Sequence, residues 1–286
     1  MIKTELDFVK INAGDIHLGT NRGGLFFAAE RPRHQVKIEY SFYISEKCIP
    51  VEFWNEIFIE EKSIPNYDKM THKDMERFFE LLNKKDQQFK YRLPSESEWE
   101  LAKSKGILTN IPDKNGELLA DQPHVSYWGA PCDGSPWLEK NPKAAGFSMQ
   151  LIKTRTSKKG FSHHKLHNEN IRFRIIKLNH DPINTVSRTL PKEFDRLEIL
   201  KREFLMAILI GIIPSFIWAY FNASPGYILT GFGNLILGGV FFSLITGLII
   251  RPKHASLEFK QNNLISISPY TKKVKTLVAF EGDEIL

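Results

Sequence analysis

The sequence predicts an α+β fold, in which an irregular, loop-rich domain is followed by a transmembrane helical hairpin and a small β-rich tail. Three observations support this prediction. Short apolar alternations and glycine-containing turns fill the first part, two long uncharged apolar runs follow Phe194, and short alternating runs close the chain. We therefore expect a folded domain over residues 1–180, a basic linker over 181–203, two membrane helices over 204–250 and a cytosolic tail over 251–286.

Length and composition allow one hydrophobic core with an appendage. The 286 residues are 42% hydrophobic and 25% charged. The formal net charge of +6 is spread along the chain, which indicates a solvated basic surface, and we expect no nucleic-acid partner. Two cysteines, Cys48 and Cys132, cannot build a disulfide framework and favour a reducing compartment. The N-terminal residues lack the pattern of a signal peptide.

The first half of the chain combines strands, turns and two amphipathic helices. Pro50 is placed to open the first helix, and Thr71 is placed to cap the second. The stretch 107–161 is rich in Gly, Pro, Asn and Asp and has little periodicity, so it predicts long loops of the kind that often carry binding sites. The expected elements, in order, are strands Asp7–Ile11 and Gln35–Tyr43 and helices Val51–Glu61 and Lys73–Leu82.

The most specific stretch is 91–102, which marks the start of a helix by several independent signals. Ser95 is a natural N-cap, and Glu98 stands three residues later, as a capping box requires. Pro94 keeps the residue before it out of helical geometry. Trp99 supplies apolar surface, and Gly106 offers a left-handed stop. The sequence therefore predicts a short, deeply anchored helix.

The residues of this stretch, RLPSESEWELA, resemble the signature of the formylglycine-generating enzyme, or sulfatase-modifying factor, family. Three further segments resemble family landmarks in the same order: Phe8–Gly14 with Leu18–Gly19, Glu30–Val36, and Glu169–Ile175. The resemblance covers about residues 5–178 and implies the irregular C-type-lectin-like fold of that family. It implies a structural signature formed by Arg92, Leu93, Pro94, Ser95, Glu98, Trp99, Asn170, Phe173 and Arg174.

The chemistry of the family does not carry over to this sequence. Members that make formylglycine hold copper with two closely spaced cysteines shortly before the closing strand, because soft thiolates suit copper(I). The corresponding segment here, Thr154–Asn170, contains no cysteine, and Cys48 and Cys132 match neither position. The family's Gly-Asn-Val-Trp-Glu-Trp loop is also missing, and residues 127–134 stand roughly in its place. The sequence therefore favours a non-catalytic binding or interaction module, for which we expect no cofactor.

Two alternatives stay open. The first is a metal-dependent oxidoreductase, related to the formylglycine-generating enzyme, that holds copper or iron with histidine. The second is a structural subunit of a membrane complex. The candidate metal ligands are His163, His164, His167 and Glu169, with His124 as a further ligand. For a binding module that recognises a protein or peptide through the loops 121–137 and 154–169, the candidate residues are Tyr127, Trp128, Asp133, Arg155, Lys158 and Lys159.

The apolar runs Phe204–Phe221 and Tyr227–Ile250 are long enough to cross a bilayer. Because the linker Asn222–Gly226 is so short, they must form an antiparallel hairpin, and Pro214 is expected to kink its first helix. Small residues recur every four positions along the second run. They let the two helices approach closely or, alternatively, form a homodimer contact. These small residues are Gly239, Ser243 and Gly247.

Charges flanking the runs predict their orientation. Basic residues precede the first run and follow the second, whereas the linker has none, so the positive-inside rule places both termini in the cytosol. The expected partner of residues 204–250 is the lipid bilayer. In the tail, Ser256–Phe280, alternation in Leu264–Ile267 and Val274–Phe280 predicts a small cytosolic β-hairpin or meander. The basic residues are Arg196, Lys201, Arg202, Arg251 and Lys253.

Overall fold

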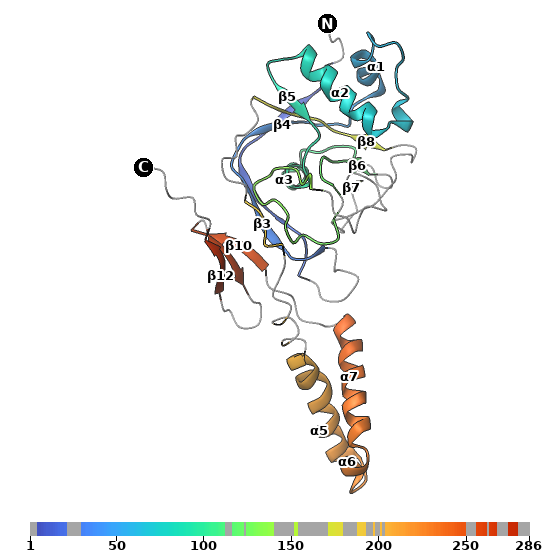
Figure 1. Ribbon diagram of the computed structural model, residues 1–286, viewed down its shortest axis with the longest axis vertical. Helices are drawn as coiled ribbons and strands as arrows, with labels where there is room; N and C mark the ends of the chain where they lie inside the picture. Colours follow the sequence, from blue (N-terminus) through green and yellow to red (C-terminus); the bar gives the residue numbers. More distant parts are fainter. Residues whose placement is uncertain are drawn as a thin grey trace.

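The structure is a computed structural model. The residues that it describes are 5–21, 30–111, 116–122, 124–139, 152–153, 171–179, 188–192, 197, 201, 204–249, 256–261, 263–267 and 274–279. Figure 1 shows a globular part formed mainly by the first half of the chain, from which a pair of helices projects. The strands of the C-terminal tail lie beside the globular part. The architecture is α+β, irregular and rich in loops, as the sequence predicts.

The strands form three small sheets. The first has the order β1-β4-β9-β5 and consists of β1 (Phe8–Ile11), β4 (Phe42–Ser45), β9 (Ile176–Leu178) and β5 (Lys90–Arg92). The second has the order β12-β11-β10-β3-β2 and consists of β12 (Val274–Ala279), β11 (Asn263–Ile267), β10 (Ser256–Lys260), β3 (His34–Ile38) and β2 (Gly14–Leu18). The third has the order β7-β6-β8 and consists of β7 (Ile152–Lys153), β6 (Glu117–Leu118) and β8 (Arg172–Phe173).

The single strand predicted over Gln35–Tyr43 is wrong, because the chain divides there between two sheets. The first half, β3, pairs with β2, and the second half, β4, pairs with β1. Residues 39–41 belong to neither strand. Tyr40 lies in this break, and its hydroxyl donates to Glu98 in the first turn of the helix Glu96–Ser104. Alternation within each half gave no sign of this change of sheet.

Two helices pack on a mainly aromatic core at one end of the domain. Helix α1 (Val51–Ile57) ends four residues earlier than predicted, in a turn closed by the Glu61 N–H donating to the Phe58 carbonyl (2.9 Å). Helix α2 (His72–Lys85) is longer than predicted and begins with the expected capping box of Thr71 and Asp74. Trp54 of α1 stacks on Phe78 of α2, with their ring centroids 5.0 Å apart.

A second core lies between the sheets and α3 (Glu96–Ser104). It gathers residues from the N-terminal strands, α3, the loop 121–137, β9 and the tail. Trp99 is fully buried there, and the second core continues through Tyr127 to Leu257 of β10 and Leu264 of β11. The tail is a meander, as predicted, but it does not stand alone. β10 runs parallel to β3 and extends the sheet of the N-terminal part.

The projecting pair of helices is a tightly packed hairpin. Among the described residues, one helix, Phe204–Asn222, is long and apolar enough to cross a membrane. It contains a π-helical segment, η4 (Ala207–Ile212), which runs directly into α5 (Ile213–Asn222). The wider turn accommodates Pro214, whose ring would clash in a regular helix. After α6 (Tyr227–Thr230), the chain returns through α7 (Phe232–Ile249).

Two of the three small residues predicted on the second helix, Gly239 and Ser243, face the first helix of the same chain. A Cβ atom on Gly239 would lie 2.7 Å from the Ile212 Cα, and one on Gly211 would lie 3.0 Å from the Ser243 Cβ. The two backbones therefore touch at this crossing. Gly239 and Ser243 are buried inside the hairpin. Gly247 lies on α7, but its surroundings fall outside the described residues.

Candidate functional site at the cap of helix α3

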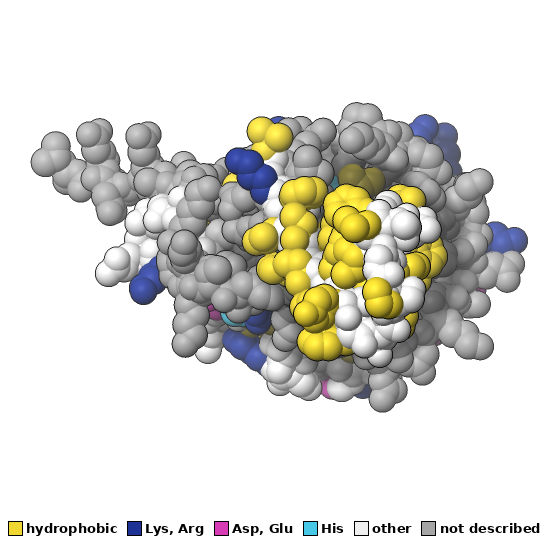
Figure 2. Space-filling model, turned by 90° about the horizontal axis from the view of Figure 1, so that it is seen from below, with side chains coloured by type: hydrophobic (Ala, Val, Ile, Leu, Met, Phe, Trp, Pro, Cys, Tyr) yellow, Lys and Arg dark blue, Asp and Glu magenta, His cyan; other side chains and the backbone are white. Residues whose placement is uncertain are grey.

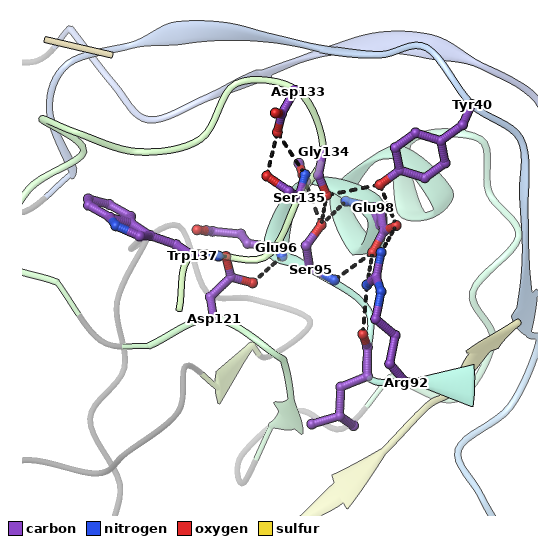
Figure 3. A network of polar contacts seen from close by, with 12 residues as sticks. Tyr40, Arg92, Ser95, Glu96, Glu98, Asp121, Asp133, Gly134, Ser135 and Trp137 are labelled. Carbon is purple, nitrogen blue, oxygen red and sulfur yellow. Dashed lines mark hydrogen bonds and ion pairs between the residues drawn. The ribbon is translucent and has the colours of Figure 1, made fainter. Parts of the chain in front are cut away.

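Figure 3 shows a network of polar contacts around the N-terminus of α3. Pro94 precedes the helix, and Ser95 has the extended backbone of an N-cap (φ −70°, ψ 164°). The Glu98 N–H donates to the Ser95 Oγ (3.2 Å), and the Ser95 N–H donates to the Glu98 carboxylate (2.7 Å). The predicted capping box is thus confirmed in both directions.

Glu98 is fully buried, and hydrogen bonds from three residues converge on its carboxylate. Arg92 donates to both oxygens from its two terminal nitrogens (2.8 Å each), and the Tyr40 hydroxyl donates to Oε1 (2.7 Å). With the Ser95 N–H, this makes four bonds to one carboxylate. Bidentate pairs between arginine and carboxylate are strong and directional. The arrangement ties β5, α3 and the segment between β3 and β4 together.

The same cap holds the loop 121–137 through Gly134. The Ser95 hydroxyl donates to the Gly134 carbonyl (2.8 Å), and the Tyr40 hydroxyl lies 3.1 Å from it. Gly134 has a left-handed backbone (φ +92°), and a Cβ atom there would lie 2.9 Å from the Tyr40 Oη. Only glycine fits this position without strain. The loop is therefore fixed to the start of the helix by its backbone.

Asp121 fixes the loop at a second point. Its carboxylate accepts the N–H groups of Glu96 (2.7 Å) and Trp137 (2.9 Å), so it joins the first turn of α3 to the end of the loop. Glu96 in turn accepts a hydrogen bond from the Tyr127 hydroxyl (2.8 Å). Burial and the neighbouring Glu96 carboxylate raise the pKa of Asp121 from its ordinary 3.8 to about 7.

This pKa predicts how stability depends on pH. The folded state holds the Asp121 proton more tightly than the unfolded state. The contribution of this proton to the free energy of unfolding is therefore fully present below pH 4 and is lost as the pH rises towards 7. We expect Asp121→Asn to remove a slope of about 1 kcal/mol per pH unit across this window. Urea unfolding at a series of pH values measures the difference from wild type. Asp68→Asn, at an exposed carboxylate, is the control, and an unchanged slope in Asp121→Asn would contradict the prediction.

The residues predicted to bind a ligand are placed as follows. Tyr127 is buried, and its hydroxyl bonds to Glu96. Asp133 is buried and accepts hydrogen bonds from the N–H and hydroxyl of Ser135 and from the Arg188 N–H. Trp128 is half-buried against the second core. Residues outside the described part of the chain are Arg155, Lys158, Lys159, His163, His164, His167, Glu169 and Asn170.

A second buried network joins α3 to β6 and to Arg174, which lies between β8 and β9. Glu117 of β6 accepts hydrogen bonds from the Arg174 Nε (2.8 Å) and Nη2 (2.9 Å) and from the Trp99 indole N–H (2.9 Å). Arg174 and Glu117 are both fully buried. Phe173, beside them, belongs to the aromatic core of α1 and α2. Glu117 thus joins Trp99 of α3 to Arg174 in one buried network.

Glu117 and Asp121 were not among the residues predicted from the sequence, although both are central to these networks. They flank the apolar Leu118, Leu119 and Ala120 in a stretch that predicted only irregular structure. The apolar run predicts burial of the residues between them, but a carboxylate at either end of such a run is ordinarily solvated, because burying an unpaired charge is costly. Their partners, however, lie 16 to 57 residues away in sequence.

The described residues contain no group of three or more His, Cys, Asp and Glu side chains that could hold a metal ion. His124 stacks on Trp137, and burial lowers its pKa to about 4. Burial, with the Glu117 carboxylate, raises the pKa of the Cys48 thiol to about 12. Burial and Asp133 raise the pKa of Cys132 as well. The raised pKa values keep both thiols protonated at neutral pH, and a protonated thiol is a poor nucleophile.

Fold and site together define an α+β domain that is irregular and rich in loops, carries an apolar helical hairpin and takes the strands of its own tail into its second sheet. No protein-family model matches the sequence, and no curated protein matches it significantly. Among solved structures, PvdO from Pseudomonas aeruginosa is similar at 17% identity, over 59% of this chain and 93% of that one, with a TM-score of 0.45. At this TM-score, the similarity assigns neither a family nor an activity to the chain.

Proposed function

We propose that the chain is a membrane-anchored, sulfatase-modifying-factor-like domain that works as a non-catalytic binding or interaction module at the membrane surface. The observation that carries this proposal is the exposed apolar surface of the hairpin. The helix Phe204–Asn222 has a mean hydropathy of 2.2, yet only 11% of it is buried. A core helix of a water-soluble protein would be mostly covered, whereas a lipid-facing helix is not. Figure 2 shows hydrophobic side chains gathered over this projection.

Two hydroxyl groups of the hairpin donate to backbone carbonyls of their own helix, as suits a bilayer. The Ser215 hydroxyl donates to the Gly211 carbonyl (2.9 Å), and the Thr246 hydroxyl donates to the Phe242 carbonyl (2.8 Å). Such internal bonds remove polar hydrogens from the lipid phase. Exposed aromatic side chains gather on both sides of the turn, which suits the membrane–water interface at the far end of the hairpin. They are Trp218, Tyr220, Phe221 and Tyr227.

Both flanks of the hairpin pair with the same globular domain, which supports an even number of crossings. Before the hairpin, the Leu190 N–H donates to the Ala130 carbonyl (2.9 Å). After it, the Leu257 N–H donates to the Arg33 carbonyl (2.9 Å). The chain must therefore leave the domain and return on the same side. Together with the basic residues at both ends of residues 204–250, this supports two spans with a cytosolic domain.

The non-catalytic part of the proposal is supported by sequence and chemistry. The segment Thr154–Asn170 lacks the cysteine pair of copper-dependent relatives. In the described residues, the Glu98 carboxylate is bonded by three neighbouring residues, and the two thiols are protonated. The bonds to Glu98 hold parts of the domain together, and neither described thiol presents a thiolate.

A charge placed on the lipid face tests the anchor. Phe241 is near the middle of α7 and is 66% exposed. We expect Phe241→Arg to make membrane insertion less favourable by roughly 2.5–3.5 kcal/mol. A smaller fraction of the protein should then stay in the membrane during alkaline extraction. Leu138→Arg, on the globular domain at 65% exposure, should leave that fraction unchanged. Equal behaviour of the two variants would rule out the anchor.

Single introduced cysteines test the orientation. Ser224 lies in the turn of the hairpin, and Thr276 lies on β12, and both are exposed. In intact cells, a membrane-impermeant maleimide should label Ser224→Cys and leave Thr276→Cys unlabelled. The raised pKa values of Cys48 and Cys132 keep the background low. The reverse labelling pattern would contradict a cytosolic domain.

The metal content of the detergent-purified protein separates the binding module from the alternative oxidoreductase. Mass spectrometry after loading with copper(I) or iron(II) should find no stoichiometric metal. Metal that is bound by wild type and lost when His163, His164 and His167 are replaced together would replace the binding module with a histidine-based enzyme. A membrane protein that co-purifies stoichiometrically, and is lost only with the hairpin, would instead favour the structural subunit.

A further inference from the structure

Asn234 is a polar residue within the apolar hairpin, and its side-chain amide has no hydrogen-bond partner among the described residues. It lies on α7 and is exposed. Two other polar side chains of the hairpin are bonded to their own helix. The Asn222 amide donates to the Trp218 carbonyl (3.0 Å), and the Thr230 hydroxyl donates to the Tyr227 carbonyl (3.3 Å). Asn234 differs from them because its amide is free to bond to a partner outside the hairpin.

Contacts between the two helices give the level of Asn234 along the hairpin. On one side of it, the rings of Phe232 and Phe216 lie 5.4 Å apart between their centroids. On the other side, a Cβ atom on Gly239 would lie 2.7 Å from the Ile212 Cα. Asn234 is therefore level with the middle of the first helix of the hairpin. In the proposed anchor, on which this inference rests, an unbonded amide at this depth lies in hydrocarbon, where it is costly.

Asn234 belongs to a stripe of exposed residues that runs along α7. Its members follow each other at steps of four, three and four residues, which is the spacing along one seam of a coiled coil. A Cβ atom on Gly238 would meet nothing within 4 Å, so another helix can approach closely there. The neighbouring Gly239 packs on the first helix instead, so the stripe faces away from that helix. This outward stripe consists of Asn234, Gly238, Phe241 and Ile245.

We propose that Asn234 is the centre of a homodimer contact in which two copies of the hairpin meet along the outward stripe. A side-chain amide carries donors and an acceptor, so in a two-fold symmetric pair each Asn234 donates to the oxygen of the other. Two copies that insert in the same orientation bring this group to the same depth. A different membrane protein would need its own polar group placed at that depth. The second copy is therefore the partner that the stripe fits.

Disulfide crosslinking of the purified full-length protein in phosphatidylcholine vesicles tests the contact. After oxidation with copper phenanthroline and air, Phe241→Cys in the outward stripe should form a covalent dimer. Val240→Cys is the matched control, because Val240 is also exposed on α7 but points roughly 100° away from Phe241. It should stay monomeric. Wild type, which has only Cys48 and Cys132, sets the background.

Removal of the amide should weaken the dimer. In the Phe241→Cys protein, Asn234→Leu should raise the protein-to-lipid ratio at half-maximal crosslinking by about 3- to 10-fold, as expected for one interhelical hydrogen bond. Leucine favours the lipid phase, so this variant keeps the chain inserted. Thr230→Val is the control. It removes a hydroxyl one turn away on the same face that is already bonded within its helix, and it should leave the ratio unchanged.

Equal crosslinking of Phe241→Cys and Val240→Cys would overturn the homodimer, and so would an Asn234→Leu protein that crosslinks at the original ratio. A crosslink that forms only in cell membranes and joins the chain to another protein would assign the stripe to that protein instead. Alkaline extraction of the same vesicles separates the two proposals. A chain that resists extraction without crosslinking overturns the dimer alone, whereas a chain that is extracted overturns the anchor.

Discussion

Arg174→Met should unfold the domain at much lower denaturant concentrations than wild type, with a loss on the order of 3–5 kcal/mol. The substitution keeps much of the volume but leaves Glu117 as a buried carboxylate without its ion-pair partner. It also removes hydrogen bonds from the Arg174 guanidinium to the backbone carbonyls of Glu46 and Thr109. Urea unfolding followed by tryptophan fluorescence measures the loss, since Trp99 donates to the same carboxylate.

The neighbouring Arg172→Met is the matched control. Arg172 lies two positions away on β8, forms its ion pair with the exposed Asp68 and is itself partly exposed. Surface pairs of this kind contribute about 0–1 kcal/mol, so the control should stay close to wild type. Equal losses at the two positions would contradict the idea that the fully buried pair with Glu117 is a central support of the fold.

Glu98→Ala should cost a similar amount, on the order of 3–5 kcal/mol, because it leaves Arg92 without its ion-pair partner and removes half of the capping box. It should also release the loop 130–134, since Tyr40 and Ser95 both bond to Glu98 and both contact Gly134. Thermal unfolding measures the stability, and hydrogen exchange at the Ser135 amide, whose partner Asp133 lies in this loop, measures the release.

Glu76→Ala is the control for this prediction. Glu76 is an exposed helical glutamate whose ion pair with His72 lies one turn away on the surface of α2. Its loss should change stability by about 0.5 kcal/mol at most. A stable Glu98→Ala protein whose Ser135 amide remains protected would mean that the loop is held by its own contacts and not by the cap.

The sequence determined those features that depend on residues close together in the chain. The capping boxes at Ser95 and Thr71 formed as predicted, because a cap needs only a side chain and the backbone three residues on. The apolar hairpin followed from the length of its runs and the shortness of its linker. The close approach at Gly239 likewise follows from a local pattern, since small residues at every fourth position share one face of a helix.

Other features depend on contacts between segments that are far apart in the sequence, and no local pattern predicts such contacts. Pairing partners of Glu117 and Arg188 lie tens of residues away or more, and carboxylates in a glycine-rich stretch look like solvated loop. The strand predicted over Gln35–Tyr43 failed for the same reason, because alternation reports which residues face inward but not which sheet a strand joins. The histidine and lysine candidates of residues 154–169 stay predictions.

The sequence by itself thus determined a capped signature helix, an α+β domain and an apolar hairpin, all of which are encoded by residues within a few turns of one another. Only the tertiary structure decided that the tail belongs to the domain. Leu257 and Leu264 complete a core whose other members precede them by more than 60 residues of chain. Burial of apolar surface is not directional. A short alternating strand can therefore bury its apolar side chains beside any sheet that has a free edge. The open edge was that of β3, and the meander occupies it.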